Sequence, residues 1–170
     1  MEGSRGLGDV YKRQPQYFYQ WSGTWQKICT ALTVILMALG LYWALVISPP
    51  DYQQSETVRI MYIHVPSAWM SMFTYLVMAG SGAVAMIWRI KVAEIVVAQS
   101  AIIGASFTLL ALVTGMLWGK PMWGAYWVWD ARLTSELVLL FLYIGVLAIY
   151  SAYEDPRTVS YTHLRAHETL

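Results

Sequence analysis

The sequence is short of charged residues and of cysteine. Charged side chains make up 12% of the 170 residues and hydrophobic ones 58%, whereas a soluble domain carries about twice that share of charge. The formal net charge is +1 without a basic stripe, so nothing points to a nucleic-acid partner. Cys29 is the single cysteine, which excludes an intrachain disulfide and a CxxC redox pair. The composition therefore indicates a protein of the lipid bilayer.

Four apolar runs are long enough to cross a membrane as helices, which takes about 20 residues each. They are Ile28–Ser48, a run from near Pro66 to Trp88, Ala93–Trp118 and Leu133–Tyr153. Pro49-Pro50 ends the first run, and Gly119-Lys120-Pro121 is expected to break the third. We place Pro66 in the first turn of the second helix, where its missing N–H would be unpaired anyway. The predicted fold is all-α, a polytopic membrane helix bundle with four transmembrane helices.

The two polar or aromatic connectors fall on one side of the membrane in this arrangement. They are DYQQSETVR (51–59) and WGAYWVWD (123–130). The opposite side has slightly more lysine and arginine, which favours the cytoplasm there and an outward position for both connectors. Small residues in the second and third runs are expected to permit close helix packing; they are Gly80, Ser81, Gly82, Ala83, Ala85, Gly104, Ala105 and Ser106.

The end of the third run and the connector after it are dense in aromatic residues: Trp118, Trp123, Tyr126, Trp127 and Trp129. One interpretation is an interfacial belt, because indoles and phenols partition to the headgroup level. The other is a platform for a large, flat, apolar ligand, since an aromatic pair adds about 0.5–1.5 kcal/mol beyond its area burial. Composition alone leaves both interpretations open.

His64, in MYIHVPSAWM, is the only histidine outside the C-terminal tail. It precedes the predicted second helix, on the same side as the tryptophans. A neutral imidazole is the usual nitrogen ligand of haem iron. A lone histidine more often hydrogen-bonds at a helix start, but the shared side with the aromatic cluster favours the ligand interpretation.

Charged residues follow the tryptophans. Asp130 or Thr134 is placed to cap the fourth helix, and acids such as Glu136 near a helix N-terminus stabilise its dipole. A functional account has a basic side chain facing a ligand carboxylate, because the guanidinium fork matches that geometry; the candidates are Arg132, Arg59 and Lys120. The sequence does not decide between the two accounts.

Both ends of the chain differ in character from what they flank. We interpret residues 1–14 as a non-native leader, residues 15–158 as part of a membrane domain, and residues 159–170 as a non-native tail. His163 and His167 share an i, i+4 spacing. They lie in that tail, on the opposite side from the tryptophans, and we assign them no role.

The segment LWGKPMWGAYWVWDARLTSELVLLFLY (117–143) resembles the tryptophan-rich WWD signature, here 118–134, of the haem-handling cytochrome c maturation proteins. VRIMYIHVPSAWMSM (58–72), with DYQQ just before it, resembles the CcmC branch of that family. The similarity covers most of Asp51–Asp155.

The resemblance implies a six-span protein of the bacterial inner membrane, with the WWD segment facing the periplasm. Its members present haem b to the periplasmic chaperone CcmE, alongside CcmD and the ABC transporter subunits CcmA and CcmB. Two periplasmic histidines ligate the iron in the family. The first matches His64, and the second lies beyond the end of this sequence. Tyr126 stands where relatives usually have tryptophan, and Met61 or Met122 has no support as a substitute ligand over ordinary packing.

We therefore expect a membrane haem-binding and haem-delivery protein, of the kind sometimes termed a haem lyase, rather than a catalyst. His64 would ligate the metal, Asp130 would hold the end of the platform, and Arg132 would meet a propionate. The platform itself would be Trp118, Trp123, Tyr126, Trp127 and Trp129. The alternative is a permease subunit of an ABC-type haem exporter, which needs polar groups within the spans; few are present beyond Gln99 and scattered serines and threonines.

Overall fold

The computed structural model describes the backbone of residues 3–153 and the side chains of residues 21–90 and 92–152. The predicted tail, with His163 and His167, lies outside these residues. The chain divides into two compact units, Met1–Pro49 and Pro50–Leu170.

The first unit is one long helix. α1 (Gly3–Tyr42) continues into a π-helical turn, η1 (Trp43–Ile47), in which the Ser48 N–H donates to the Trp43 carbonyl oxygen at 2.9 Å. Within it, Trp21–Ile47 is long and apolar enough to cross a membrane, with a mean hydropathy of 2.2. A helix satisfies its own backbone hydrogen bonds, as hydrocarbon requires. The predicted stop at Pro49-Pro50 is confirmed.

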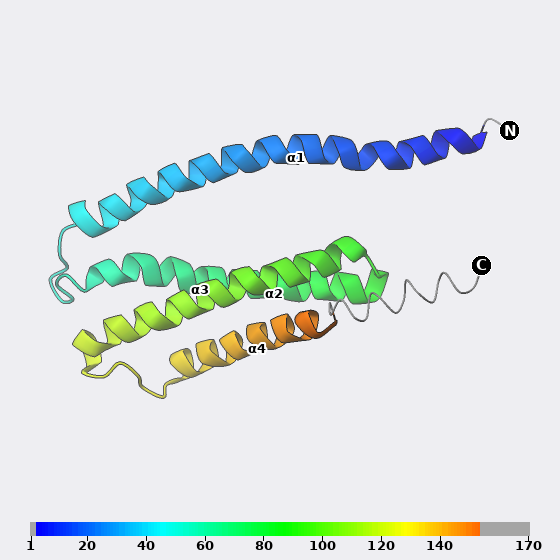
Figure 1. The fold of residues 1–170 in the computed structure, drawn as a ribbon. Coiled ribbons are helices and arrows are strands. Elements are labelled where there is room, and N and C mark those ends of the chain that lie inside the picture. The colour runs from blue at the N-terminus through cyan, green and yellow to red at the C-terminus, as the bar shows by residue number, and fades with distance from the viewer. Residues whose placement is uncertain (1–2, 154–170) are drawn as a thin grey trace. The chain divides into compact units, whose positions relative to one another are not determined.

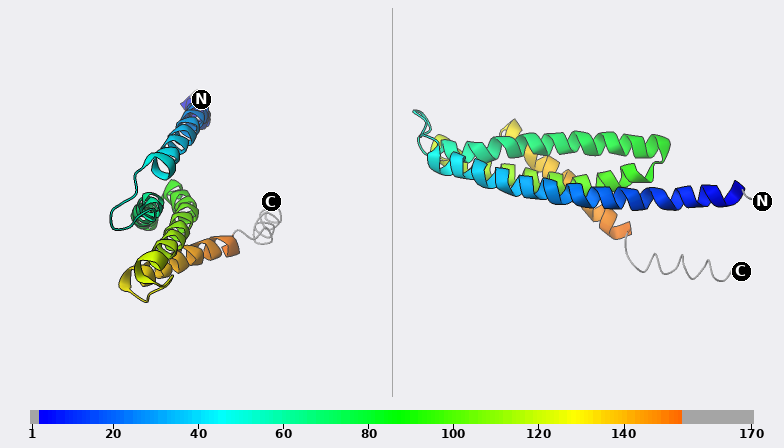
Figure 2. Two further views of the ribbon diagram at one scale, coloured as in Figure 1. Left: turned by 90° about the vertical axis from the view of Figure 1, so that its left-hand side faces the viewer. Right: turned by 90° about the horizontal axis from the view of Figure 1, so that it is seen from above.

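The second unit is a bundle of three helices, α2 (Val58–Trp88), α3 (Lys91–Trp123) and α4 (Ala131–Tyr153). Figures 1 and 2 show α2 and α3 side by side and antiparallel, with α4 packed against α3 at an angle. All three are candidate membrane spans, so the four predicted transmembrane helices are confirmed. The start of α2, the end of α3 and the start of α4 consequently meet at one end of this unit.

Two predicted helix boundaries are wrong. α2 begins at Val58, eight residues before Pro66, so Pro66 lies inside the helix. A membrane helix tolerates an internal proline when side chains bond nearby carbonyls, and the Ser67 hydroxyl donates to the Ile63 carbonyl at 2.7 Å. α3 runs through Pro121 to Trp123, because a proline in the last turn costs little, and Gly124 (φ 79°) ends the helix with its N–H on the Lys120 carbonyl.

The core of the bundle forms around Tyr143 of α4, which is fully buried. Its hydroxyl donates to the Ser71 carbonyl of α2 at 2.9 Å. A Cβ atom placed on Gly104 of α3 would lie 2.2 Å from Cζ of Tyr143, so only glycine admits the ring there. The predicted small-residue packing is thus confirmed at Gly104, whereas a Cβ on Gly80 would meet no other atom within 4 Å and Ser106 is exposed.

Candidate functional site

A cavity of about 480 Å³ opens at the end of the bundle where the three helices meet. It brings together five of the predicted site residues, namely His64, Trp118, Trp123, Asp130 and Arg132. α2 contributes the histidine, the end of α3 the tryptophans, and the start of α4 the charged pair. This volume lies in the range of small-molecule and cofactor sites.

The imidazole of His64 is held by α3. Nδ1 lies 3.0 Å from the Ala111 carbonyl oxygen and 3.2 Å from the Thr114 hydroxyl oxygen, which itself donates to the Leu110 carbonyl. A carbonyl oxygen only accepts hydrogen bonds, so the network assigns the proton of the neutral imidazole to Nδ1. Nε2 is then left with a lone pair, which is the arrangement that orients a histidine as a metal ligand.

The same imidazole requires a glycine beside it. A Cβ atom on Gly115 would lie 3.0 Å from Cε1 of His64, tighter than an ordinary contact. The small residue on α3 therefore lets the ring of His64 enter the space between the two helices and reach the cavity.

Trp118 and Trp123 form one aromatic pair at the cavity. Their ring centroids are 5.1 Å apart and their planes meet at 88°, an edge-to-face contact. The Trp118 indole N–H donates to the Gln54 side-chain oxygen at 2.9 Å, which ties the first connector to the end of α3. The Thr57 hydroxyl, also of that connector, lies 3.9 Å from the Met122 sulfur. The prediction that both connectors lie on one side is confirmed within this unit.

Trp127 and Trp129 form a second pair, 5.2 Å apart at 77°, outside the cavity lining. Trp129 is largely exposed, whereas the buried indole nitrogen of Trp127 has no hydrogen-bond partner among the described residues. Tyr126 is exposed, and the Lys120 ammonium lies 5.3 Å from its ring centroid. The five aromatic residues thus make two edge-to-face pairs and a separate phenol rather than one flat surface.

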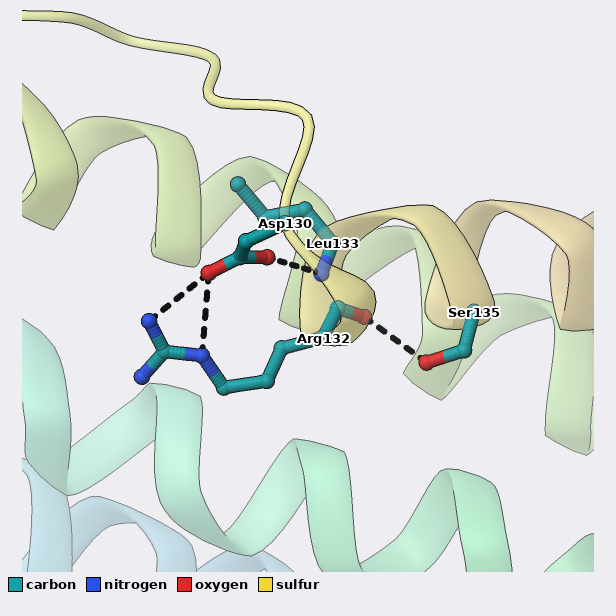
Figure 3. A network of polar contacts seen from close by, with 4 residues as sticks. All are labelled: Asp130, Arg132, Leu133 and Ser135. Atoms are coloured by element: carbon teal, nitrogen blue, oxygen red, sulfur yellow. Dashed lines mark hydrogen bonds and ion pairs between the residues drawn. The ribbon is translucent and has the colours of Figure 1, made fainter.

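Asp130 caps α4 and binds Arg132 (Figure 3). One carboxylate oxygen accepts from the Leu133 N–H at 2.9 Å, and the other accepts from the Arg132 guanidinium at 2.7 and 3.0 Å. The Leu133 N–H and, next, the Arg132 side chain hold the pKa of Asp130 below its ordinary value. The guanidinium also lies 5.2 Å from the Trp123 ring centroid. The capping role and the orientation of Arg132 toward the site therefore coexist.

The other basic candidates are engaged elsewhere. Arg59 forms an ion pair with Glu56 at 2.6 Å, and the Lys120 ammonium donates to the Gly124 carbonyl at 3.1 Å. Met61 lines the cavity beside His64, whereas Met122 is absent from its lining.

Glu136 is the site residue that sequence reasoning missed. It lines the cavity from α4, is half-buried, and accepts a hydrogen bond from the Ser71 hydroxyl at 2.7 Å. The position of Glu136 in the second turn of a membrane span could have predicted this placement. An acid at that depth costs free energy unless it faces the interior of the bundle. In the sequence alone, Glu136 is explained as an acid that the helix dipole stabilises.

Comparisons with known proteins agree with one another. A family model described as heme exporter protein C (CcmC) matches residues 10–163. Heme exporter protein C of Haemophilus influenzae is 50% identical over 142 residues, which is 84% of this chain and 58% of that protein. The protein of the same name in Escherichia coli K12 is 49% identical over 143 residues, with the same coverage.

A plant relative is also similar. The putative cytochrome c biosynthesis ccmC-like mitochondrial protein of Marchantia polymorpha is 44% identical over 134 residues, or 79% of this chain and 59% of that protein. This chain thus spans about 58% of the length of the bacterial relatives named above.

Proposed function

The chain belongs to the heme exporter protein C (CcmC) family, and we propose that it holds haem at the outward face of the bacterial inner membrane for transfer to the chaperone CcmE. Haem is the cargo in this account, so it is bound and released rather than consumed. The observation that carries the proposal is the position of His64, which lines the cavity while its Nδ1 lies 3.0 Å from the Ala111 carbonyl oxygen of α3. In the proposed site Nε2 would bind the iron.

The residues around the cavity suit a porphyrin. The Trp118 and Trp123 rings supply apolar aromatic surface on one side, and Arg132 supplies a guanidinium for a propionate. Asp130 keeps that guanidinium beside the Trp123 ring. In the proposed complex Trp127 and Trp129 extend the contact surface beyond the cavity, and Tyr126 stacks in the same region.

The wider assembly forms part of the same proposal. CcmE would receive the haem, while CcmD and the transporter subunits CcmA and CcmB would work beside this protein in the membrane. The second axial ligand would be a histidine from sequence that this chain does not contain. A ligand exchange between that histidine, His64 and CcmE would move the iron without an acid–base step by this chain.

A permease subunit for haem remains the alternative function. It requires polar groups along a path through the spans. Thr74 and Ser67 are buried, and each donates to a carbonyl of its own helix, so these groups are satisfied within α2. That arrangement supports a binding site at one end of the bundle more than a path through it.

Haem binding by the purified chain in lipid nanodiscs tests the proposal. The chain is loaded with ferric haem, separated from free haem by gel filtration, and measured by absorption and electron paramagnetic resonance. We expect a bound haem with nitrogen ligation that is lost in His64→Ala and weakened in Trp118→Ala. Trp88→Ala is the matched control, because Trp88 is an exposed tryptophan at the opposite end of α2. Equal spectra for all three variants and the wild type would refute the proposed site.

A further inference from the structure

Glu136 is a carboxyl group placed inside the membrane span of α4. It lies in the second turn of the helix, roughly 8 Å along the axis from Ala131 at a rise of 1.5 Å per residue. It faces α2, where the Ser71 hydroxyl lies 2.7 Å from its Oε1 atom and 2.9 Å from the Ala68 carbonyl oxygen. Ser71 is itself fully buried, so this contact holds the carboxyl group toward the interior of the bundle.

The charges that line the cavity do not cancel. Arg132 and Asp130 form an ion pair at 2.7 Å and neutralise each other. In the part of the chain whose side chains are described, no lysine or arginine forms an ion pair with Glu136. An ionised Glu136 therefore adds one negative charge to the wall that His64 shares.

A negative charge at that place distinguishes porphyrins by the charge of their metal. A porphyrin ring that binds a metal carries two negative charges, so its core is neutral with a divalent metal and has one positive charge with a trivalent metal. Coulomb attraction acts over a longer range in a partly buried site than in water. The propionates are the same in both cases and meet Arg132 equally.

We propose that Glu136 makes this cavity selective for metalloporphyrins with a trivalent metal, so that ferric haem is held and ferrous haem is disfavoured. The inference rests on the proposed function, because it requires that the cavity of His64 is the haem site. Glu136 acts here as a specificity-determining residue through its charge, and Ser71 as the residue that orients it.

Redox-inert metalloporphyrins separate core charge from electron transfer. Gallium(III) and zinc(II) protoporphyrin IX share the macrocycle and the propionates but differ by one charge at the core. Both are titrated by fluorescence against the whole chain in nanodiscs, as wild type, Glu136→Gln, Glu136→Asp and Glu94→Gln. Glu94 is an exposed acid in the first turn of α3, outside the cavity, so it controls for the loss of one negative charge.

We expect Glu136→Gln to weaken gallium(III) protoporphyrin binding about tenfold and to leave zinc(II) protoporphyrin binding within about twofold of the wild type. Glu136→Asp and Glu94→Gln should retain the preference for the trivalent metal. With haem itself, Glu136→Gln should raise the midpoint potential of the bound iron. Equal losses for both probes in Glu136→Gln, or an unchanged ratio, would overturn the inference while leaving the proposed function intact. A wild-type chain that binds neither probe would instead refute the proposed function.

Discussion

Replacing Gly104 by alanine tests the packing that positions the site. The new Cβ atom would lie 2.2 Å from Cζ and 2.5 Å from the hydroxyl oxygen of Tyr143. Tyr143 is fully buried and its hydroxyl is bonded to the Ser71 carbonyl, so any movement of the ring disturbs its packing or this bond. Either α4 shifts away from α3 or Tyr143 leaves its hydrogen bond.

Both responses cost free energy of unfolding. Overpacking of a core by one methyl group costs about 1–3 kcal/mol, and the lost hydroxyl bond about 0.5–1.5 kcal/mol. Since either response relieves the clash, we expect Gly104→Ala to lower the free energy of unfolding by about 1–3 kcal/mol. A displaced α4 would also carry Arg132 and Glu136 away from His64, so haem affinity should fall with stability.

Reversible unfolding in mixed detergent micelles, followed by circular dichroism, measures the effect. Gly80→Ala is the matched control, since its Cβ atom would meet nothing within 4 Å and it makes the same change within a span. In a Tyr143→Leu background the cost of Gly104→Ala should shrink, because the two positions are in contact and their effects do not add. If Gly104→Ala lowers the free energy of unfolding no more than Gly80→Ala does, then α3 and α4 do not approach closely at this position.

Two further predictions concern the connectors. The pKa of Asp130 is lowered because the Leu133 N–H and the Arg132 side chain bind the charged carboxylate. The ionised carboxylate therefore stabilises the fold above the ordinary aspartate pKa. This stabilisation is lost as the pH falls through the lowered pKa. Asp130→Asn should therefore reduce the acid dependence of unfolding below about pH 4, and an unchanged pH profile would contradict this. Trp118→Phe keeps an aromatic ring but removes the indole bond to Gln54, which should cost about 0.5–1.5 kcal/mol and speed amide exchange in residues 51–57. Equal exchange rates in the variant and the wild type would show that this bond does not hold the connector.

Helix boundaries illustrate how far local sequence rules reach. The stop at Pro49-Pro50 was predictable because two consecutive prolines remove two backbone donors and follow a long apolar run. The corresponding prediction, that Pro66 lies in the first turn of its helix, is wrong. It considers only the missing N–H of the proline, whereas in the structure the Ser67 hydroxyl donates to a carbonyl of the preceding turn. A rule for proline considers only the residues next to it. At Pro66 the hydroxyl of Ser67 bonds the nearby Ile63 carbonyl, and the helix continues on both sides of the proline.

The site shows a similar division. Residue types and a match to a known signature single out His64 and the tryptophans in the sequence, and the structure brings His64, Trp118 and Trp123 to one cavity. The CcmC resemblance is confirmed by the family match. Glu136 was missed because a lone acid near a helix start has an ordinary explanation in the helix dipole. Its orientation toward Ser71 depends on how α4 packs on α2. The spacing of residues along α4 alone does not predict this packing.

The sequence by itself determined the membrane class, the four apolar helices, the shared side of the two connectors and the family. These follow from composition, from runs of about 20 apolar residues and from motifs that are continuous in the chain, so none of them requires a contact between distant residues. Only the tertiary structure decided that Nδ1 of His64 is bonded by α3, that the tryptophans form two edge-to-face pairs, and that Glu136 joins the cavity. The contacts of His64 and Glu136 join residues that are 47 and 65 positions apart in the chain. Such contacts depend on how closely the helices approach, which packing at Gly104 and Gly115 sets.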